Sequence, residues 1–242
     1  LVLAAVSLMA QEDDPCAPAT MTIMGSPIDA RKSPTAPNKL AETRDLDWFK
    51  QNMIHTVPAL YPGAFRRVYP GFLQLASFMG INLSRHVCAH HAYFQYLFYN
   101  DAASTEKHRD FYDEYLAVMD LSEEFYIQTL EEVFQKYTLA NGTMMHRGKR
   151  VDPGAITKTA LLTVEGENDD ISGIGQTQAA HDICVNIPET MRRDYIQPGV
   201  GHYGVFSGRR FRTEIYPRMR EFIRAFQSRN ARRAKLKVVS EA

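Results

Sequence analysis

The sequence predicts an α/β protein with a mainly parallel sheet and a long helical insertion. Two strand patterns, each followed by a helical pattern, lie in the last third of the chain, and a buried-strand pattern lies near its beginning. Strands and helices that alternate in this way indicate a parallel sheet with crossover connections. The residues between are polar, aromatic and mostly helical in pattern. At 242 residues the chain can bury one core, or one core and a subdomain.

The chain begins with an apolar run, residues 1–10, that permits two interpretations. Ala4, Ala5, Leu8 and Met9 are typical of a buried helix, but the run also imitates the end of a secretory signal. The lack of an initiator Met and of a basic leader favours an internal helix of a longer chain. Residues 20–30 then predict a short buried strand that ends in a Gly/Pro turn.

Two helices stand out in the insertion. The first is predicted to begin after Ser104 and to run through Leu121, with apolar residues near 3.6-residue spacing. The second is predicted to begin at Ser122, and its apolar side consists of Phe125, Leu130, Val133 and Phe134.

The last third of the chain predicts a strand over residues 156–164, a helix over 173–186 and a short strand over 193–198. A final amphipathic helix carries Phe211, Ile215, Met219, Phe222, Ile223 and Phe226. The predicted domains are therefore a core in two segments, residues 1–32 and 153–228, a helical insertion over 33–152, and a basic, disordered tail over 229–242.

Charge and cysteine content exclude several classes of protein. Lys plus Arg and Asp plus Glu number 28 each, so the overall charge indicates no nucleic-acid partner. Basic residues do gather after Arg218, where a solvated helix end is the simpler interpretation and an anchor for an anionic surface is the alternative. Three widely spaced cysteines predict neither a disulfide framework nor a metal motif. No segment is long and apolar enough to span a bilayer.

One histidine pair has the spacing of two metal ligands on a helix. His86 and His90 are four residues apart and could share a helix face. The segment lacks the Glu of a His-Glu-x-x-His motif and an obvious third ligand. We therefore predict neither a metal nor a cofactor.

An acid and a histidine follow the last two predicted strands. Asp169 comes just after one strand, and His202 comes just after the next, flanked by Gly201 and Gly204, which let the chain turn. Because functional groups gather at the carboxyl ends of parallel strands, we expect these side chains to meet. A hydrolytic triad of an α/β-hydrolase has the chain order nucleophile, acid, histidine. Asp169 and His202 are thus predicted to be catalytic, with Asp170 as an alternative acid.

The nucleophile of such a triad has no candidate at the expected place. The sequence contains no Gly-x-Ser-x-Gly, and no cysteine follows a strand and opens a helix. Cys16 lies in a loop before a strand and is a poor candidate. Since residues 1–10 occupy the place of the helix behind the nucleophile, the nucleophile and the oxyanion-hole amides are expected shortly before Leu1. The predicted fold is therefore an incomplete α/β-hydrolase with a helical cap.

Six segments closely resemble intracellular poly(3-hydroxybutyrate) depolymerases. The resemblance extends over nearly the whole chain except its last dozen or so residues. The six segments are residues 24–31 (MGSPIDAR), 69–74 (YPGFLQ), 108–115 (HRDFYDEY), 164–171 (VEGENDDI), 186–188 (NIP) and 199–206 (GVGHYGVF). The resemblance implies a cytoplasmic enzyme at polyester granules that releases 3-hydroxybutyrate or oligomers. It also implies Asp169 as the acid, His202 as the base and a cysteine nucleophile, in a Cys-Gln-Pro setting, that precedes this chain by a few residues. The chain alone is then expected to be inactive.

The aromatic-dense middle of the chain fits a cap over the active site. Most of its rings are expected to fill the core of that subdomain, and the others to contact an apolar polyester chain. They are Tyr61, Phe65, Tyr69, Phe72, Phe78, Tyr93, Phe94, Tyr96, Phe98 and Tyr99.

The sequence is also compatible with three other functions. The first is an esterase or thioesterase that acts on soluble acyl substrates, and the second is a non-catalytic granule-surface protein. The third is a polymer synthase, which is similar in fold and nucleophile. The sequence does not indicate an oligomeric state.

Overall fold

The computed structural model describes residues 1–226 and divides the chain into two compact units. Unit 1 contains residues 1–44 and the chain from residue 130 onward, and unit 2 is Asp45–Thr129. The predicted insertion, residues 33–152, contains unit 2 and extends beyond it at both ends. The predicted tail, residues 229–242, and the end of the predicted core, residues 227–228, lie outside the described residues. The assignment of domains stays a prediction.

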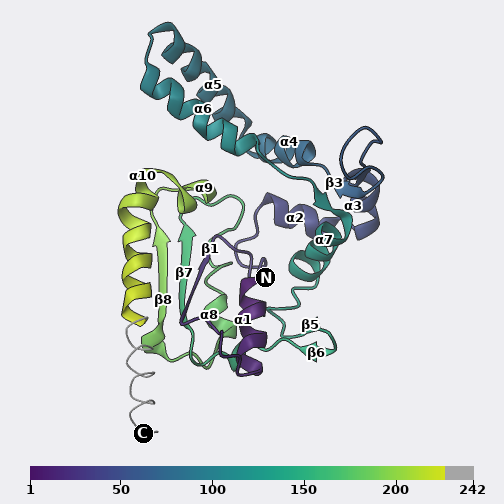
Figure 1. Cartoon of the computed structure of the whole chain (residues 1–242), viewed down its shortest axis with the longest axis vertical. Helices are drawn as coiled ribbons and strands as arrows, with labels where there is room; N and C mark the ends of the chain where they lie inside the picture. The colour runs from purple at the N-terminus through teal and green to yellow at the C-terminus, as the bar shows by residue number, and fades with distance from the viewer. Residues whose placement is uncertain (227–242) are drawn as a thin grey trace. The chain divides into compact units, whose positions relative to one another are not determined.

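Unit 1 is built on a parallel sheet of three strands in the order β1-β7-β8. The strands are β1 (Thr20–Met24), β7 (Ala160–Gly166) and β8 (Arg192–Gln197), and all three point the same way in Figure 1. Thr20 of β1 pairs with Ala160, and Arg192 of β8 pairs with Leu161. The prediction of an α/β protein with a parallel sheet is confirmed.

Helices cover both faces of this sheet (Figure 1). One face packs against α1 (Val2–Gln11) and α8 (Ala180–Ile183). The other packs against α9 (His202–Phe206) and a helical stretch made of α10 (Gly208–Arg210), the π-helix η4 (Phe211–Ile215) and residues 216–226. The unit therefore has three layers, which bury both faces of the sheet.

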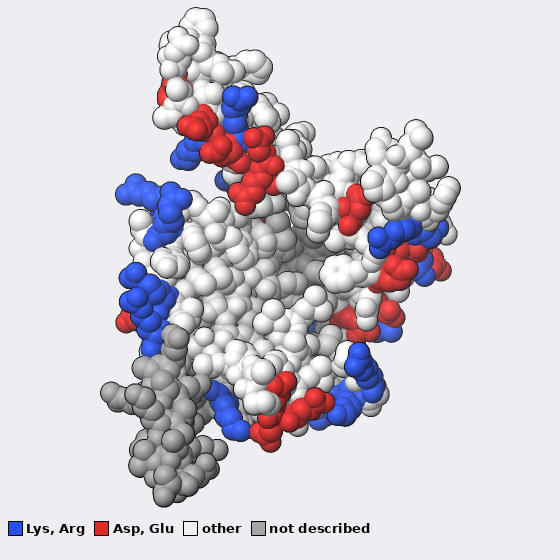
Figure 2. Space-filling model, viewed as in Figure 1, with Lys and Arg blue, Asp and Glu red and all other residues white. Residues whose placement is uncertain are grey.

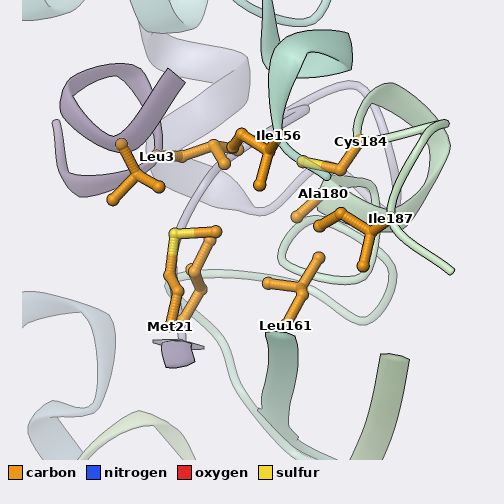
Figure 3. Packing of buried hydrophobic residues seen from close by; sticks show 9 residues of the cluster. Leu3, Met21, Ile156, Leu161, Ala180, Cys184 and Ile187 are labelled. Atoms are coloured by element: carbon orange, nitrogen blue, oxygen red, sulfur yellow. The ribbon is translucent and has the colours of Figure 1, made fainter. Parts of the chain in front are cut away.

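The central strand β7 is buried along its whole length, as expected for a parallel strand between two helical layers. Its side chains alternate between two hydrophobic clusters. Figure 3 shows the first, in which Leu161 packs with Leu3 of α1, Met21 of β1, Ala180 of α8 and Cys184 directly after α8. The second contains Ala160, Leu162, Val164, Val200, Val205, Ile215, Phe222 and Phe226.

Shorter elements complete unit 1. They are α2 (Ala36–Thr43), the π-helix η1 (Leu130–Gln135), the hairpin of β5 (Met145–His146) and β6 (Lys149–Arg150), and the 3-10 turns η2 (Pro153–Ala155) and η3 (Glu189–Met191). The first turn of α2 is held by a capping box between Thr35 and Asn38.

Unit 2 combines helices with a small antiparallel sheet. The sheet has the order β2-β3-β4 and consists of β2 (His55–Thr56), β3 (Arg67–Tyr69) and β4 (Leu121–Ser122). The helices are α3 (Leu46–Asn52), α4 (Gly71–Ile81), α5 (Leu83–Phe98), α6 (Ala102–Leu116) and α7 (Glu123–Thr129). α5 and α6 pack against each other as a helical hairpin. Within the described part of the chain, no helix has the length and apolar composition required to cross a bilayer.

Several predicted boundaries are wrong. The helix predicted after Ser104 begins earlier, at Ala102, because Asp101 caps it by accepting a hydrogen bond from the backbone N–H of Ser104 at 3.1 Å. It ends at Leu116, since Leu121 pairs with Tyr69 in the small sheet. The strand predicted over residues 156–164 is β7, four residues later at its start.

The helix predicted over residues 173–186 is reduced to the four residues of α8. Gly175 has φ of +93°, which an α-helix does not allow, and residues 174–179, directly before α8, form turns. The first helix is confirmed at residues 2–11, but its buried side chains are Leu3, Val6 and Ser7, and Ala5 is exposed.

Candidate active site

The carboxyl ends of β7 and β8 bring an acid and a histidine into contact. Asp169 lies in the loop after β7, and His202 is the first residue of α9, after β8. Oδ2 of Asp169 and Nδ1 of His202 are 2.8 Å apart. The side chain of Asp169 is fully buried, and that of His202 is 20% exposed. The two side chains that the sequence selects therefore meet, 33 residues apart in the chain.

The second oxygen of Asp169 fixes the orientation of its carboxylate. Oδ1 accepts hydrogen bonds from the backbone N–H groups of Ile171, at 2.9 Å, and of Ser172, at 2.8 Å. One oxygen is thus held by its own loop while the other faces the imidazole. This division gives the carboxylate a single orientation toward His202.

The histidine is oriented for proton transfer through its second nitrogen. A carboxylate can only accept from Nδ1–H, so this pairing selects the tautomer whose Nε2 carries a lone pair. Within residues 1–226, Nε2 has no hydrogen-bond partner. The edges of two aromatic rings flank the imidazole, those of Tyr203 and Phe206, with centroids 6.0 and 5.3 Å away. Nε2 is therefore free to act as a base.

Glycine at two strand ends makes room for the pair. Gly25, directly after β1, has φ of +47°, and a Cβ there would lie 3.1 Å from Cε1 of His202. A Cβ on Gly166, the last residue of β7, would lie 2.8 Å from the carbonyl oxygen of Val200. The end of β1 thus lies against the imidazole, and the ends of β7 and β8 approach as closely as backbone allows.

The turn before His202 depends on a different glycine from those predicted. Gly199 has φ of +65°, in the left-handed region, whereas Gly201 has φ of −89°. Gly201 and Gly204 are small for another reason: a Cβ would lie 3.3 Å from the carbonyl oxygen of Asn168 and 2.7 Å from Cβ of Val200, respectively. Close packing, and not backbone freedom, requires them.

Sequence comparison decides the family. The chain matches the family described as PHB de-polymerase C-terminus over residues 25–227, which is more than four-fifths of its length. The match includes β7, β8 and both residues of the acid–histidine pair. The chain belongs to this depolymerase family. Among curated proteins, none matches the sequence.

The loops that carry the pair in this depolymerase-family chain are joined by hydrogen bonds. The backbone N–H of Glu167 donates to the carbonyl of Gln197 at 3.0 Å, and that of Asn168 donates to the carbonyl of Val200 at 2.9 Å. The carboxylate of Glu167 accepts from the N–H of Gly199 at 2.7 Å. The two loops are therefore tied together on either side of the Asp169–His202 contact.

Glu165 is a supporting residue that sequence reasoning missed. This fully buried residue of β7 accepts three backbone N–H bonds, from Gly175 at 2.8 Å, Thr177 at 2.7 Å and Gln178 at 3.0 Å. Thr177 in turn exchanges hydrogen bonds with the backbone of Ser26, beside Gly25. A carboxylate inside an otherwise apolar strand was the signal that could have revealed it, because buried charges require partners.

The turn after β1 carries a second buried carboxylate. Nε and a terminal nitrogen of Arg31 donate to the two oxygens of Asp29, at 2.7 and 2.9 Å. These bonds lower the pKa of Asp29 below its ordinary value. The two parallel bonds hold Arg31 against Asp29 in the turn that follows Gly25.

The other predicted or rejected site residues lie elsewhere. Asp169, and not Asp170, is the residue hydrogen-bonded to Nδ1 of His202. Cys16 precedes β1, on the amino side of the sheet, and is exposed. Cys184 belongs to the first hydrophobic cluster, where burial raises the pKa of its thiol to about 12. A thiol with this pKa is protonated at neutral pH and is a poor nucleophile.

The histidines weighed as a metal site contact aromatic rings. Nδ1 of His86 is 2.9 Å from the hydroxyl of Tyr112, and the ring of His90 lies 4.4 Å from that of Tyr112. Within residues 1–226, no cluster of three or more His, Cys, Asp or Glu side chains is arranged to hold a metal ion.

Proposed function

We propose that this chain is the C-terminal part of an intracellular depolymerase that hydrolyses the ester bonds of poly(3-hydroxybutyrate) at cytoplasmic granules. In this proposal unit 1 is the later part of an α/β-hydrolase core, and residues 33–152 form its cap. Asp169 and His202 complete a triad with a cysteine that precedes Leu1. The 2.8 Å contact between Asp169 and His202, in a chain of the PHB de-polymerase C-terminus family, carries the proposal.

The proposed first step forms an acyl-enzyme. Nε2 of His202 removes the thiol proton, and the thiolate sulfur attacks the ester carbonyl carbon of the polymer. The carbon–oxygen bond to the leaving chain then breaks. The imidazolium returns its proton to the departing oxygen, so that an alcohol end and a thioester are formed. Asp169 stabilises the imidazolium and keeps Nε2 directed at the reacting atoms.

The proposed second step releases the acid. Nε2 removes a proton from water, the resulting hydroxide oxygen attacks the thioester carbonyl, and the carbon–sulfur bond breaks. The thiolate leaves and recovers a proton from His202. The products are 3-hydroxybutyrate or a short oligomer with a free carboxyl group, and the enzyme returns to its starting state.

The geometry around β1 supports the proposed position of the nucleophile before Leu1. In this fold the nucleophile precedes a helix, and the acid and histidine follow later strands. α1 followed by β1 supplies such a helix and the next strand, and the end of β1 lies against the imidazole. The buried Cys184 and the loop residue Cys16 do not suit the role, which supports a cysteine before Leu1.

The experiment is to assay the protein extended upstream through the proposed cysteine, on a small soluble ester and on amorphous poly(3-hydroxybutyrate). Asp169→Asn should lower kcat by about 10⁴-fold, because the imidazole loses its orientation and its counter-charge. Asp170→Asn is the matched control and should retain most of the activity. Both variants should remain folded, because an Asn side chain at position 169 keeps one oxygen that can accept from the N–H groups of Ile171 and Ser172. Residues 1–242 alone should hydrolyse neither substrate.

Each contrary result has a distinct meaning. Full activity in Asp169→Asn would remove this residue from the mechanism. An extended protein that cleaves only soluble esters would be an esterase or thioesterase. An extended protein that has no nucleophile and no activity, but still binds polymer, would be a granule-surface protein.

A further inference from the structure

The outward face of α5 exposes a stripe of apolar side chains. Leu83, Val87, Phe94 and Phe98 follow one another at helical spacing, so they lie on one face of the helix. All four are exposed, Phe94 at 69% and Phe98 at 80%. We call these four residues the α5 stripe. Single exposed apolar side chains are ordinary, but a contiguous row of them indicates an interaction surface.

The stripe is not required to hold the hairpin together. A different side of α5 packs against α6 through histidine and tyrosine rings: Tyr93 stacks on His108 at 4.4 Å, and His86 hydrogen-bonds the hydroxyl of Tyr112 at 2.9 Å. The hairpin therefore has its own interior. The exposed stripe lies outside that interior and remains available to a partner.

Charge is distributed very unevenly around this hairpin. Residues 68–100, which include α4 and α5, contain one charged residue, Arg85. α6 carries six in its 15 residues: Glu106, Lys107, Arg109, Asp110, Asp113 and Glu114. In Figure 2 the outer end of the hairpin is almost entirely white, and red and blue side chains gather farther along it. One helix thus suits an apolar, uncharged phase, and the other suits water.

We propose that the α5 stripe is a docking surface for solid polyester, separate from the acid–histidine pair. The inference rests on the proposed function for the identity of the polymer. Poly(3-hydroxybutyrate) is uncharged, lacks hydrogen-bond donors along its chain and presents methyl groups and ester carbonyls. Apolar side chains without neighbouring charges lose no hydration of charged groups when they bury against such a surface. The charged α6 then keeps the other side of the hairpin in water.

Charge complementarity favours polyester over an anionic lipid surface. Helices that bind anionic membranes carry several Lys and Arg residues beside their apolar face, each of which adds attraction. α5 offers one, Arg85. A second copy of this chain would also cover apolar groups, and analytical ultracentrifugation distinguishes such a dimer from docking to polymer.

The experiment is sedimentation of residues 1–242 with particles of amorphous poly(3-hydroxybutyrate). The test variant replaces Val87, Phe94 and Phe98 with Gln, which is polar, uncharged and compatible with a helix. The control variant replaces three exposed apolar residues of the same unit outside α5, Leu60, Tyr61 and Met119, with Gln. The dissociation constant should rise about tenfold or more in the test variant and stay near the wild-type value in the control.

Four results would overturn the inference. They are wild-type protein that does not sediment with the particles, a test variant that binds as tightly as wild type, equal losses in both variants, and stronger binding to anionic phospholipid vesicles than to polymer. Analytical ultracentrifugation gives a fifth: a wild-type dimer that the stripe variant converts to monomer would make the stripe a self-association surface. Circular dichroism confirms that the variants remain helical.

These experiments test the docking surface and the proposed ester hydrolysis independently of each other. Sedimentation requires no turnover, so a stripe-dependent protein that never cleaves an ester would uphold the docking surface and refute the proposed reaction. Conversely, an extended protein that degrades particles equally well with and without the stripe would uphold the reaction and refute the docking surface.

Discussion

At the carboxyl edge of the parallel sheet, buried polar side chains hold backbone amides in place, whereas α5 leaves large apolar side chains in solvent. Glu165 and Asp169 are buried and together accept five backbone N–H bonds. Phe94 and Phe98 are exposed. Both arrangements reverse the usual rule that apolar groups are buried and polar groups exposed. Each departure lies in a region to which we assign a proposed function: the acid–histidine pair in the first and the docking of polymer in the second.

The physical costs of the two departures differ. A buried carboxylate is tolerated only when its hydrogen bonds are satisfied, so the loops around Asp169 depend on their partners. An exposed aromatic ring costs little in the folded chain and gains free energy only when a partner covers it. Substitutions should therefore destabilise the first region and leave the stability of the second almost unchanged.

The largest expected effect is a loss of stability when Glu165 is replaced. Glu165→Ala leaves three backbone N–H groups without an acceptor in a buried site, and the free energy of unfolding should fall by about 3 kcal/mol or more. Phe94→Gln, in the exposed stripe, should change it by less than about 0.5 kcal/mol. Urea unfolding of both variants measures the difference. Comparable losses would show that the stripe contributes to the core of unit 2.

A smaller effect is expected at the glycine beside the imidazole. Gly25→Ala combines a left-handed φ with a Cβ 3.1 Å from the His202 ring, and Gly142→Ala has a similar φ of +66° with nothing within 4 Å. Both should lose about 1 kcal/mol of stability through the backbone. The extended protein should lose roughly tenfold in kcat only with Gly25→Ala, because only that Cβ displaces the base. Equal kcat values in the two variants would show that the absence of a Cβ at Gly25 is not required to position His202.

The smallest effect concerns the interior of the hairpin. Burial lowers the pKa of His86 and of His108 below the ordinary value, so both disfavour a proton when folded. Because the unfolded chain binds the protons more readily, unit 2 should lose stability as pH falls below about 6.5, and the loss should stop below the folded pKa values. Hydrogen exchange of α5 and α6 amides from pH 8 to pH 5 measures it. A His86→Gln/His108→Gln variant should show a weaker pH dependence, and an unchanged dependence would refute the assignment.

Regular patterns predicted the sheet well and the turns poorly. The strands around Ile23 and Leu161 are predicted because apolar runs indicate buried parallel strands, and the short strand around Ile196 follows at the spacing of a crossover. The helix over residues 173–186 is overpredicted because three of its N–H groups, those of Gly175, Thr177 and Gln178, bond to Glu165, which lies 10 to 13 positions earlier. Local propensity cannot anticipate such a partner, since the bond exists only once the chain has folded.

The sequence by itself determined that an acid and a histidine would meet. Parallel strands place their carboxyl ends at one edge, so residues that follow successive strands become neighbours whatever the length of chain between them. Only the tertiary structure decided that Asp169 rather than Asp170 faces Nδ1, that Gly25 lies against the ring and that Glu165 supports the loops. It alone decided which aromatic residues of α5 are exposed. The position of a residue after a parallel strand determines at which edge of the sheet it lies. The direction of its side chain and the identity of its partner depend on every element packed around it.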